Sequence, residues 1–170
     1  LNWTPDDLAA ALEAAGDNRA ELARVLEHYT REGDPQKLEA AQFLIANMPG
    51  HRYVEHGFFT EDGEEVPYDA LDYSNYKQAL AAMDALEKEH GSITYQARRS
   101  VSDLETMTAD YLIENIDLAF DAWRGAAWAE SISFEAFAEH VLPYRGSNEP
   151  LEAWRGACRE RLDDVTATLE

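Results

Sequence analysis

The stretch TADYLIENIDLAFDAW, residues 108–123, gives the strongest structural signal in the chain. Its apolar residues recur at helical spacing and occupy nearly every side of the helix that they predict, which begins at Thr108. A helix that is apolar on most sides is normally covered by neighbouring elements. The stretch therefore predicts a central helix, and the rest of the chain should supply the helices that pack around it.

Three helices are predicted before this stretch, each with its own start and stop signals. They run from Thr4 to Gly16, from Asp17 or Asn18 to Gly33, and from Asp34 to Pro49. Capping residues followed by proline mark the first and third starts. Asn18 and Glu21 have the spacing of a capping box at the start of the second.

Three further helices are predicted around and after the central one. They begin at Ser74, Ser133 and Asn148, and the first two end at Gly91 and Pro143. The last helix carries apolar residues at helical spacing, which predicts that they face the core: Leu151, Trp154, Cys158, Leu162, Val165 and Leu169. Residues 94–107 are weakly patterned, and no alternating stretch is long enough for a central strand. The predicted fold is all-α, with about seven helices in one compact domain over residues 1–170.

Residues 49–73 interrupt this helical pattern. Glycines alternate there with aromatic residues, among them Tyr53, Phe58 and Phe59. So many aromatics predict an irregular loop that packs onto the helices. The Asp62-Gly63 pair is compatible with a small hairpin inside it.

The charge of the chain argues against two classes of partner. With 34 Asp and Glu against 14 Lys and Arg, the net charge is −20, spread along the whole sequence. Such a field repels phosphate backbones and anionic lipid headgroups, so we expect neither nucleic acid nor a membrane surface as partner. No apolar run is long enough to span a bilayer, so no membrane span is expected.

Candidate metal ligands are sparse, and no metal or other cofactor is expected. Glu87 and His90 have the Glu-x-x-His spacing once, at the end of a helix, where a cation also complements the helix dipole. His51, Glu55 and His56 would need a further ligand to bind zinc.

No catalytic set can be assembled from the residue pattern. Cys158 is the single cysteine, which excludes an intrachain disulfide, and its spacing from Trp154 predicts a core position. Phosphate-binding glycine loops are absent from the sequence. We therefore expect no catalytic residues and no enzymatic activity in this chain alone.

Four segments together resemble a known region. They are AGDNRAELARVLEHY (15–29), AAQFLIANMPGH (40–51), the stretch at 108–123, and FEAFAEHVLPYRGSNEPLEAWRG (134–156). In this order they are similar to the helical N-terminal part of large secreted transglutaminase-like proteins of gut bacteria, and the resemblance covers most of residues 8–160.

The resemblance implies a non-catalytic, N-terminal helical domain of a secreted or cell-surface bacterial protein, packed against a downstream transglutaminase-like core. That core would contain the catalytic Cys, His and Asp of a papain-like hydrolase or acyltransferase acting on a peptide or glycan. Cys158 precedes the expected nucleophile and does not inherit its role. The chain starts at Leu1 rather than Met, so we expect a fragment whose residues 150–170 lead to the core.

Residues 134–156 are predicted to form a structural corner that directs the last helix towards this core. Trp154 should be buried and fix the helix to the domain. Arg145 and Arg155 are expected to pair with Glu149 or Glu152, or with a carboxylate across the junction. Together with Tyr144, these residues are the interface candidates.

The alternative is a self-contained module that binds a glycan or protein through the aromatic loop 51–73, with Tyr53, Phe58 and Phe59 as the binding candidates. The two hypotheses differ in the location of exposed apolar surface. The docking domain requires it near residues 141–160, and the binding module requires it near residues 53–73.

Overall fold

The computed structural model describes residues 1–125, 129 and 131–167, and it divides the chain into two compact units. The first, here called the helical unit, comprises residues 1–53 and 102–170; the second, the ribbon unit, comprises residues 54–101. The described structure is 61% helical, with eight helices and a three-stranded antiparallel sheet. The fold is therefore α+β, and the all-α prediction is correct for the helices and wrong for the sheet. The prediction of one domain over 1–170 stays a prediction.

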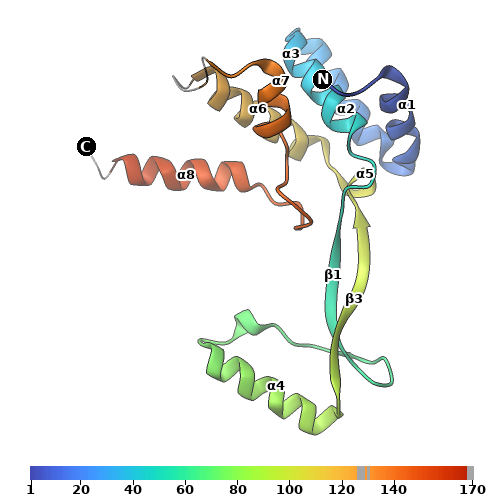
Figure 1. Cartoon of the computed structure of the whole chain (residues 1–170), viewed down its shortest axis with the longest axis vertical. Coiled ribbons are helices and arrows are strands. Elements are labelled where there is room, and N and C mark those ends of the chain that lie inside the picture. Colours follow the sequence, from blue (N-terminus) through green and yellow to red (C-terminus); the bar gives the residue numbers. More distant parts are fainter. Residues whose placement is uncertain (126–128, 130, 168–170) are drawn as a thin grey trace. The chain divides into compact units, whose positions relative to one another are not determined.

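The helical unit contains most of the helices (Figure 1). They are α1 (Pro5–Ala14), η1 (a 3₁₀ turn, Gly16–Asn18), α2 (Arg19–Glu32), α3 (Pro35–Ala46), α5 (Asp103–Thr106), α6 (Ala109–Gly125), α7 (Phe134–His140) and α8 (Trp154–Ala167). Helix α6 packs against α2 and α3, and α1 packs against α3.

Local signals set most of the helix starts correctly. Thr4 and Asp7 form a reciprocal capping box at α1, and the side chain of Asp34 accepts from the N–H groups of Gln36 and Lys37 at α3. Asn18, however, does not cap α2. Its amide donates instead to the carbonyls of Leu104 and Met107, at 3.0 and 2.9 Å.

The core of the helical unit is centred on α6, as its apolar sequence predicted. Leu112, Ile116 and Phe120 of α6 are buried, together with Phe137 of α7. The rings of Phe120 and Phe137 meet edge to face, with centroids 4.9 Å apart. One side of α6 is thus covered by neighbouring helices, while Glu114, Asp121 and Ala122 of the same helix are exposed.

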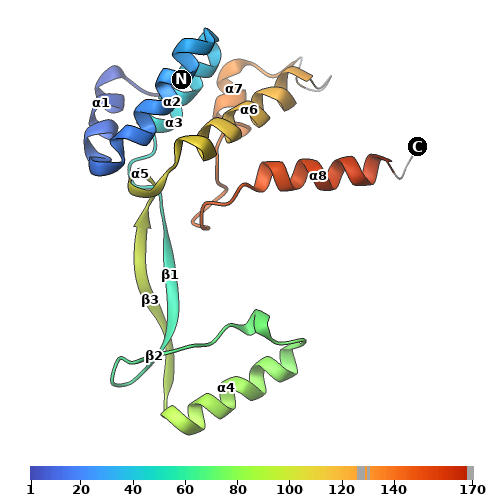
Figure 2. The same ribbon diagram turned by 180° about the vertical axis from the view of Figure 1, so that it is seen from behind.

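The ribbon unit consists of strands and one long helix (Figure 2). Its elements are β1 (Arg52–Thr60), β2 (Glu65–Val66), η2 (Ala70–Asp72), α4 (Tyr76–His90) and β3 (Ile93–Ser102). The strand order is β2-β1-β3, and the β1–β2 register places Phe58 opposite Val66. The predicted hairpin at Asp62-Gly63 is present: Gly63 has a φ of 82°, which suits a residue without Cβ, and the Thr60 N–H donates to the Glu64 carbonyl.

Strand β3 replaces the weakly patterned segment, and β1 replaces part of the predicted loop. Residues 94–100 of β3 are all exposed, so neither face of this strand is covered along most of its length. Alternation of apolar and polar residues arises when one face of a sheet is buried and the other solvated. An uncovered strand lacks that pattern, which is why the sequence did not reveal it.

No helix within the described residues is long and apolar enough to cross a membrane.

Candidate docking site at the corner between α6 and α8

A buried carboxylate fixes the start of the loop between α7 and α8. Asp103, the first residue of α5, is fully buried and accepts a hydrogen bond from the Tyr144 hydroxyl at 3.0 Å. Nη2 of Arg145 donates to the other carboxylate oxygen at 2.7 Å, and only 7% of the Arg145 side chain is exposed. Burial raises the pKa of Asp103, while Tyr144 and Arg145 act in the opposite direction. The pair thereby ties the loop to α5.

Arg145 does not form the ion pair that we predicted with Glu149 or Glu152. Its guanidinium also donates to the carbonyl of Arg52 at 3.1 Å. Glu149 instead accepts from the backbone N–H groups of Gly146 and Ser147, and backbone hydrogen bonds, first its own and then that of Gly146, lower its pKa. The prediction failed because Asp103 lies about forty positions away in sequence and contacts Arg145 only in the folded chain.

His51 extends this cluster to the surface. Its Nδ1 lies 3.0 Å from the Tyr144 hydroxyl, whose single proton is donated to Asp103, so the Nδ1–H donates to the hydroxyl oxygen. The two other residues of the zinc hypothesis are engaged elsewhere: Glu55 pairs with Arg99 at 2.8 Å, and His56 stacks on Tyr95. Among the described residues, no group of three or more His, Cys, Asp or Glu is arranged to hold a metal ion.

Helix α8 begins at Trp154, six residues after Asn148, where it was predicted to begin. The indole Nε1 of Trp154 donates to the carbonyl of Tyr144 at 2.9 Å. The Tyr111 hydroxyl of α6 lies 3.0 Å from the same carbonyl and 3.0 Å from that of Glu152. Trp154 thus fixes the first turn of α8 by its polar end. The prediction that it is buried is wrong, because 40% of it is exposed.

Arg155 joins the same turn to α6 and to the end of α7. Its Nε donates to Oδ1 of the buried Asn115 at 2.7 Å, and Nη2 donates to the carbonyls of Val141 and, at 3.0 Å, Pro143. The guanidinium also lies over the Trp154 ring, 4.4 Å from its centroid. Burial lowers the pKa of Arg155. The predicted carboxylate partner is replaced by these neutral acceptors.

A groove follows α8 beyond this anchored turn. It has a volume of about 480 Å³, and its lining includes Leu118 and Ala122 of α6 and Trp154, Cys158 and Leu162 of α8. An exposed ion pair, Arg159–Asp121 at 3.2 Å, crosses it. A second hollow, of about 320 Å³, lies on the side of Trp154 that faces Tyr144 and Pro150. Trp154 therefore lines both.

Residues 157–162 of α8 are exposed, contrary to the prediction that the apolar residues of this helix face the core. Cys158 is a free, exposed thiol, and 63% of Leu162 is exposed. The predicted positions at Val165 and Leu169 lie outside the side chains that the structure describes. The error has a physical cause: spacing shows that one helix face is apolar, and it does not show that the chain supplies a surface to cover it.

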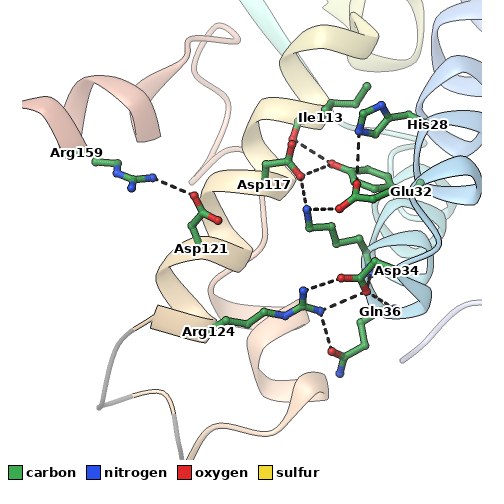
Figure 3. A network of polar contacts seen from close by, with 11 residues as sticks. His28, Glu32, Asp34, Gln36, Ile113, Asp117, Asp121, Arg124 and Arg159 are labelled. Carbon is green, nitrogen blue, oxygen red and sulfur yellow. Dashed lines mark hydrogen bonds and ion pairs between the residues drawn. The ribbon is translucent and has the colours of Figure 1, made fainter.

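Helix α6, on which this site is built, is held to α2 and α3 by polar contacts (Figure 3). Lys37 of α3 donates to Asp117 of α6 and to Glu32 of α2, both at 2.8 Å. At the end of α6, Arg124 forms an ion pair with Asp34 at 2.6 Å. The groove wall formed by α6 is thus fixed to the core.

The aromatic candidates of the alternative hypothesis are partly covered, and Phe58 packs against other rings. Tyr53, Phe58 and Phe59 are half-buried. The Phe58 ring contacts Tyr68 and Tyr95, with centroids 5.1 and 5.0 Å away. These contacts reduce the part of the Phe58 ring on which a bound sugar could stack.

Tyr144, Arg145, Trp154 and Arg155 were predicted from the sequence as interface candidates. Their hydrogen-bonding partners Asp103, Tyr111 and Asn115 were not predicted. A polar Asn115 within the most apolar helix was the one available signal for a buried hydrogen-bonding role.

Comparison with known proteins gives no match: no family model, curated protein or solved structure is significantly similar to this chain. The resemblance to transglutaminase-like proteins stays a prediction.

Proposed function

We propose that the chain is a non-catalytic helical accessory domain that docks a second folded domain along the groove between α6 and α8. The observation that carries this proposal is the contrast within α8. Its first turn is fixed by the bonds of Trp154 and Arg155, while Cys158 and Leu162 on the following turns are exposed beside a groove. A helix that is held firmly at one end and open along an apolar face suits a docking element.

The partner that we propose is a transglutaminase-like domain of the same secreted or cell-surface protein, as the sequence resemblance implies. The role of this chain would be to support that domain. Its substrate, a peptide or a glycan, would be bound by the partner.

The surroundings of Cys158 support a non-catalytic role. A cysteine nucleophile needs a base, usually histidine, within hydrogen-bonding reach. The described residues that line the groove include no histidine, and the charged ones are Asp121, Arg155 and Arg159.

The test is to measure binding of this chain to the separately produced transglutaminase-like domain by calorimetry. Leu162→Asp places a charge in the groove and should weaken binding at least about tenfold, as for a desolvated interface residue. Ala10→Asp on α1 is the control, because Ala10 is also an exposed helix residue and does not line the groove. Equal effects of the two substitutions would contradict docking at the groove.

A second readout uses the natural thiol. Cys158 should react readily with a maleimide in the free chain and at least about tenfold more slowly when the partner is bound. An unchanged labelling rate in the saturated complex would place the partner elsewhere.

The alternative, a binding module that uses residues 51–73, has less support because Tyr53, Phe58 and Phe59 are half-buried. Exposed aromatic faces are what glycan stacking would require, and the ring contacts of Phe58 reduce them.

A further inference from the structure

The two most exposed large apolar side chains among the described residues, Leu71 and Tyr76, lie in the ribbon unit, where η2 meets the start of α4. Leu71 is 90% exposed, Tyr76 80% and Leu80 47%. Tyr76 and Leu80 are one turn apart on α4, so they share a face of that helix. Element η2, which carries Leu71, packs against α4. We call these three residues the η2–α4 surface.

This surface is not needed to hold α4 in its own unit. The adjoining side of the helix does so: Ala79 is buried, and Met83 and Leu86 are half-buried. The Tyr68 hydroxyl also donates to the Ala79 carbonyl at 2.9 Å. Single exposed apolar residues are common on proteins, but neighbouring ones that serve no internal packing indicate an interaction site.

The charges around the surface indicate its partner. The ribbon unit has 10 Asp and Glu against 4 Lys and Arg. Two of these cations, Arg98 and Arg99, already pair with glutamates of the sheet. Asp69, Asp72 and Asp84 flank the η2–α4 surface in sequence and are exposed, and they form no ion pair within the described residues.

We propose that the η2–α4 surface docks a segment of a partner protein in which apolar side chains are flanked by lysines or arginines. Apolar contacts with Leu71, Tyr76 and Leu80 supply the buried area, and the flanking cations meet the three aspartates. A second copy of this chain fits poorly, because it would bring like charges together. A glycan also fits poorly, because two of the three side chains are leucines, which offer no ring and no hydrogen bond.

The experiment uses the full 170-residue chain and two synthetic amphipathic helical peptides of equal length, one of Leu and Lys and one of Leu and Glu. Fluorescence anisotropy in moderate salt should show saturable binding of the Leu/Lys peptide and none of the Leu/Glu peptide. The variant L71S/Y76S/L80S should bind the Leu/Lys peptide at least about tenfold more weakly. Because the substituted side chains are exposed, the variant should keep the circular dichroism spectrum of the parent.

A matched control is Tyr95→Ser, which changes an exposed aromatic residue of β3 outside the η2–α4 surface and should leave peptide affinity unchanged. The variant D69N/D72N/D84N keeps the shape of the side chains and removes their charge, so it should weaken binding and reduce its salt dependence. Three outcomes would overturn the proposal: absence of binding, equal affinity for L71S/Y76S/L80S, or loss of binding in Tyr95→Ser. So would self-association of the parent chain in sedimentation that L71S/Y76S/L80S abolishes, because the occupant would then be a second copy.

Discussion

The helical unit and the ribbon unit differ in how much apolar surface each buries within itself. Every member of the main core cluster belongs to the helical unit. Buried apolar residues of the ribbon unit are few and small: Val66, Ala79 and Val101. Since small units bury a smaller fraction of their surface, the ribbon unit should have the lower local stability. The comparison separates a unit stabilised by its own core from one that leaves Leu71, Tyr76 and Leu80 exposed.

The largest effect should come from a core aromatic of the helical unit. Phe120→Ala removes a ring that is 1% exposed and that contacts Phe137 and Trp123. The free energy of unfolding should fall by about 3–5 kcal/mol, measured by urea denaturation. A loss below about 1 kcal/mol would show that the helical unit does not depend on this core.

The second largest effect should come from breaking the buried ion pair between Asp103 and Arg145. Asp103→Asn removes the charge beside Arg145 but keeps an acceptor for the Tyr144 hydroxyl. Because the Arg145 guanidinium stays buried without a counter-charge, the free energy of unfolding should fall by about 3 kcal/mol. The control is Glu55→Gln in the ribbon unit, where the partner, Arg99, is 64% exposed and no measurable change is expected. Equal effects would remove the distinction between the units.

Removal of a packed aromatic ring from the ribbon unit should lower the free energy of unfolding less than the same change in the helical unit. Phe58→Ala removes a half-buried ring and its contacts with Tyr68 and Tyr95. We expect a loss of about 1–2 kcal/mol, confined to this unit. Hydrogen exchange should become faster for amides of β1 and α4 and stay unchanged for α6. Faster exchange in α6 would mean that the two units unfold together.

The smallest effect should appear in the pH dependence of the helical unit. A hydrogen bond from Arg124 holds the pKa of Asp34 at about 2, below its usual value of about 4. Because the folded-state pKa is the lower one, the pair stabilises the fold above about pH 4, and this stabilisation is lost as the pH falls towards 2. Arg124 is 42% exposed, so solvent limits the contribution to about 1 kcal/mol or less.

The check is the free energy of unfolding between pH 6 and pH 2 for the parent chain and Arg124→Gln. Only the parent should lose the contribution of this pair. Arg31→Gln, which breaks the exposed pair with Glu27 on α2, is the control and should follow the parent. Identical pH profiles for all three proteins would show that Arg124 does not stabilise the helical unit through Asp34.

Local signals in the sequence determined most of the helices and one turn. Thr4, Asp34 and Ser133 cap helices as predicted, and Gly33 ends α2 with a φ of 78°. These signals succeed because a cap is formed by residues within one turn of each other, so its chemistry is complete in a short stretch of chain.

The density of residues 134–156 likewise predicted a structural corner, and Phe137 is buried while Phe134 and Val141 pack against the core. The tertiary structure decided the rest of the site. Asn18 bonds to carbonyls more than eighty positions away, and Arg145 and Arg155 bond to α5 and α6 rather than to the nearby glutamates. No local pattern specifies such partners, because they meet only when distant segments pack.

Exposure was the other property that only the folded chain decided. The apolar spacing of Trp154, Cys158 and Leu162 correctly predicted a helix and wrongly predicted its burial. The strands β1 and β3 were not predicted because neither alternates between a buried and an exposed face: β3 is exposed along most of its length, and β1 is half-buried at most positions. Periodicity records which side chains share a face, whereas burial depends on whether another segment or another molecule covers that face.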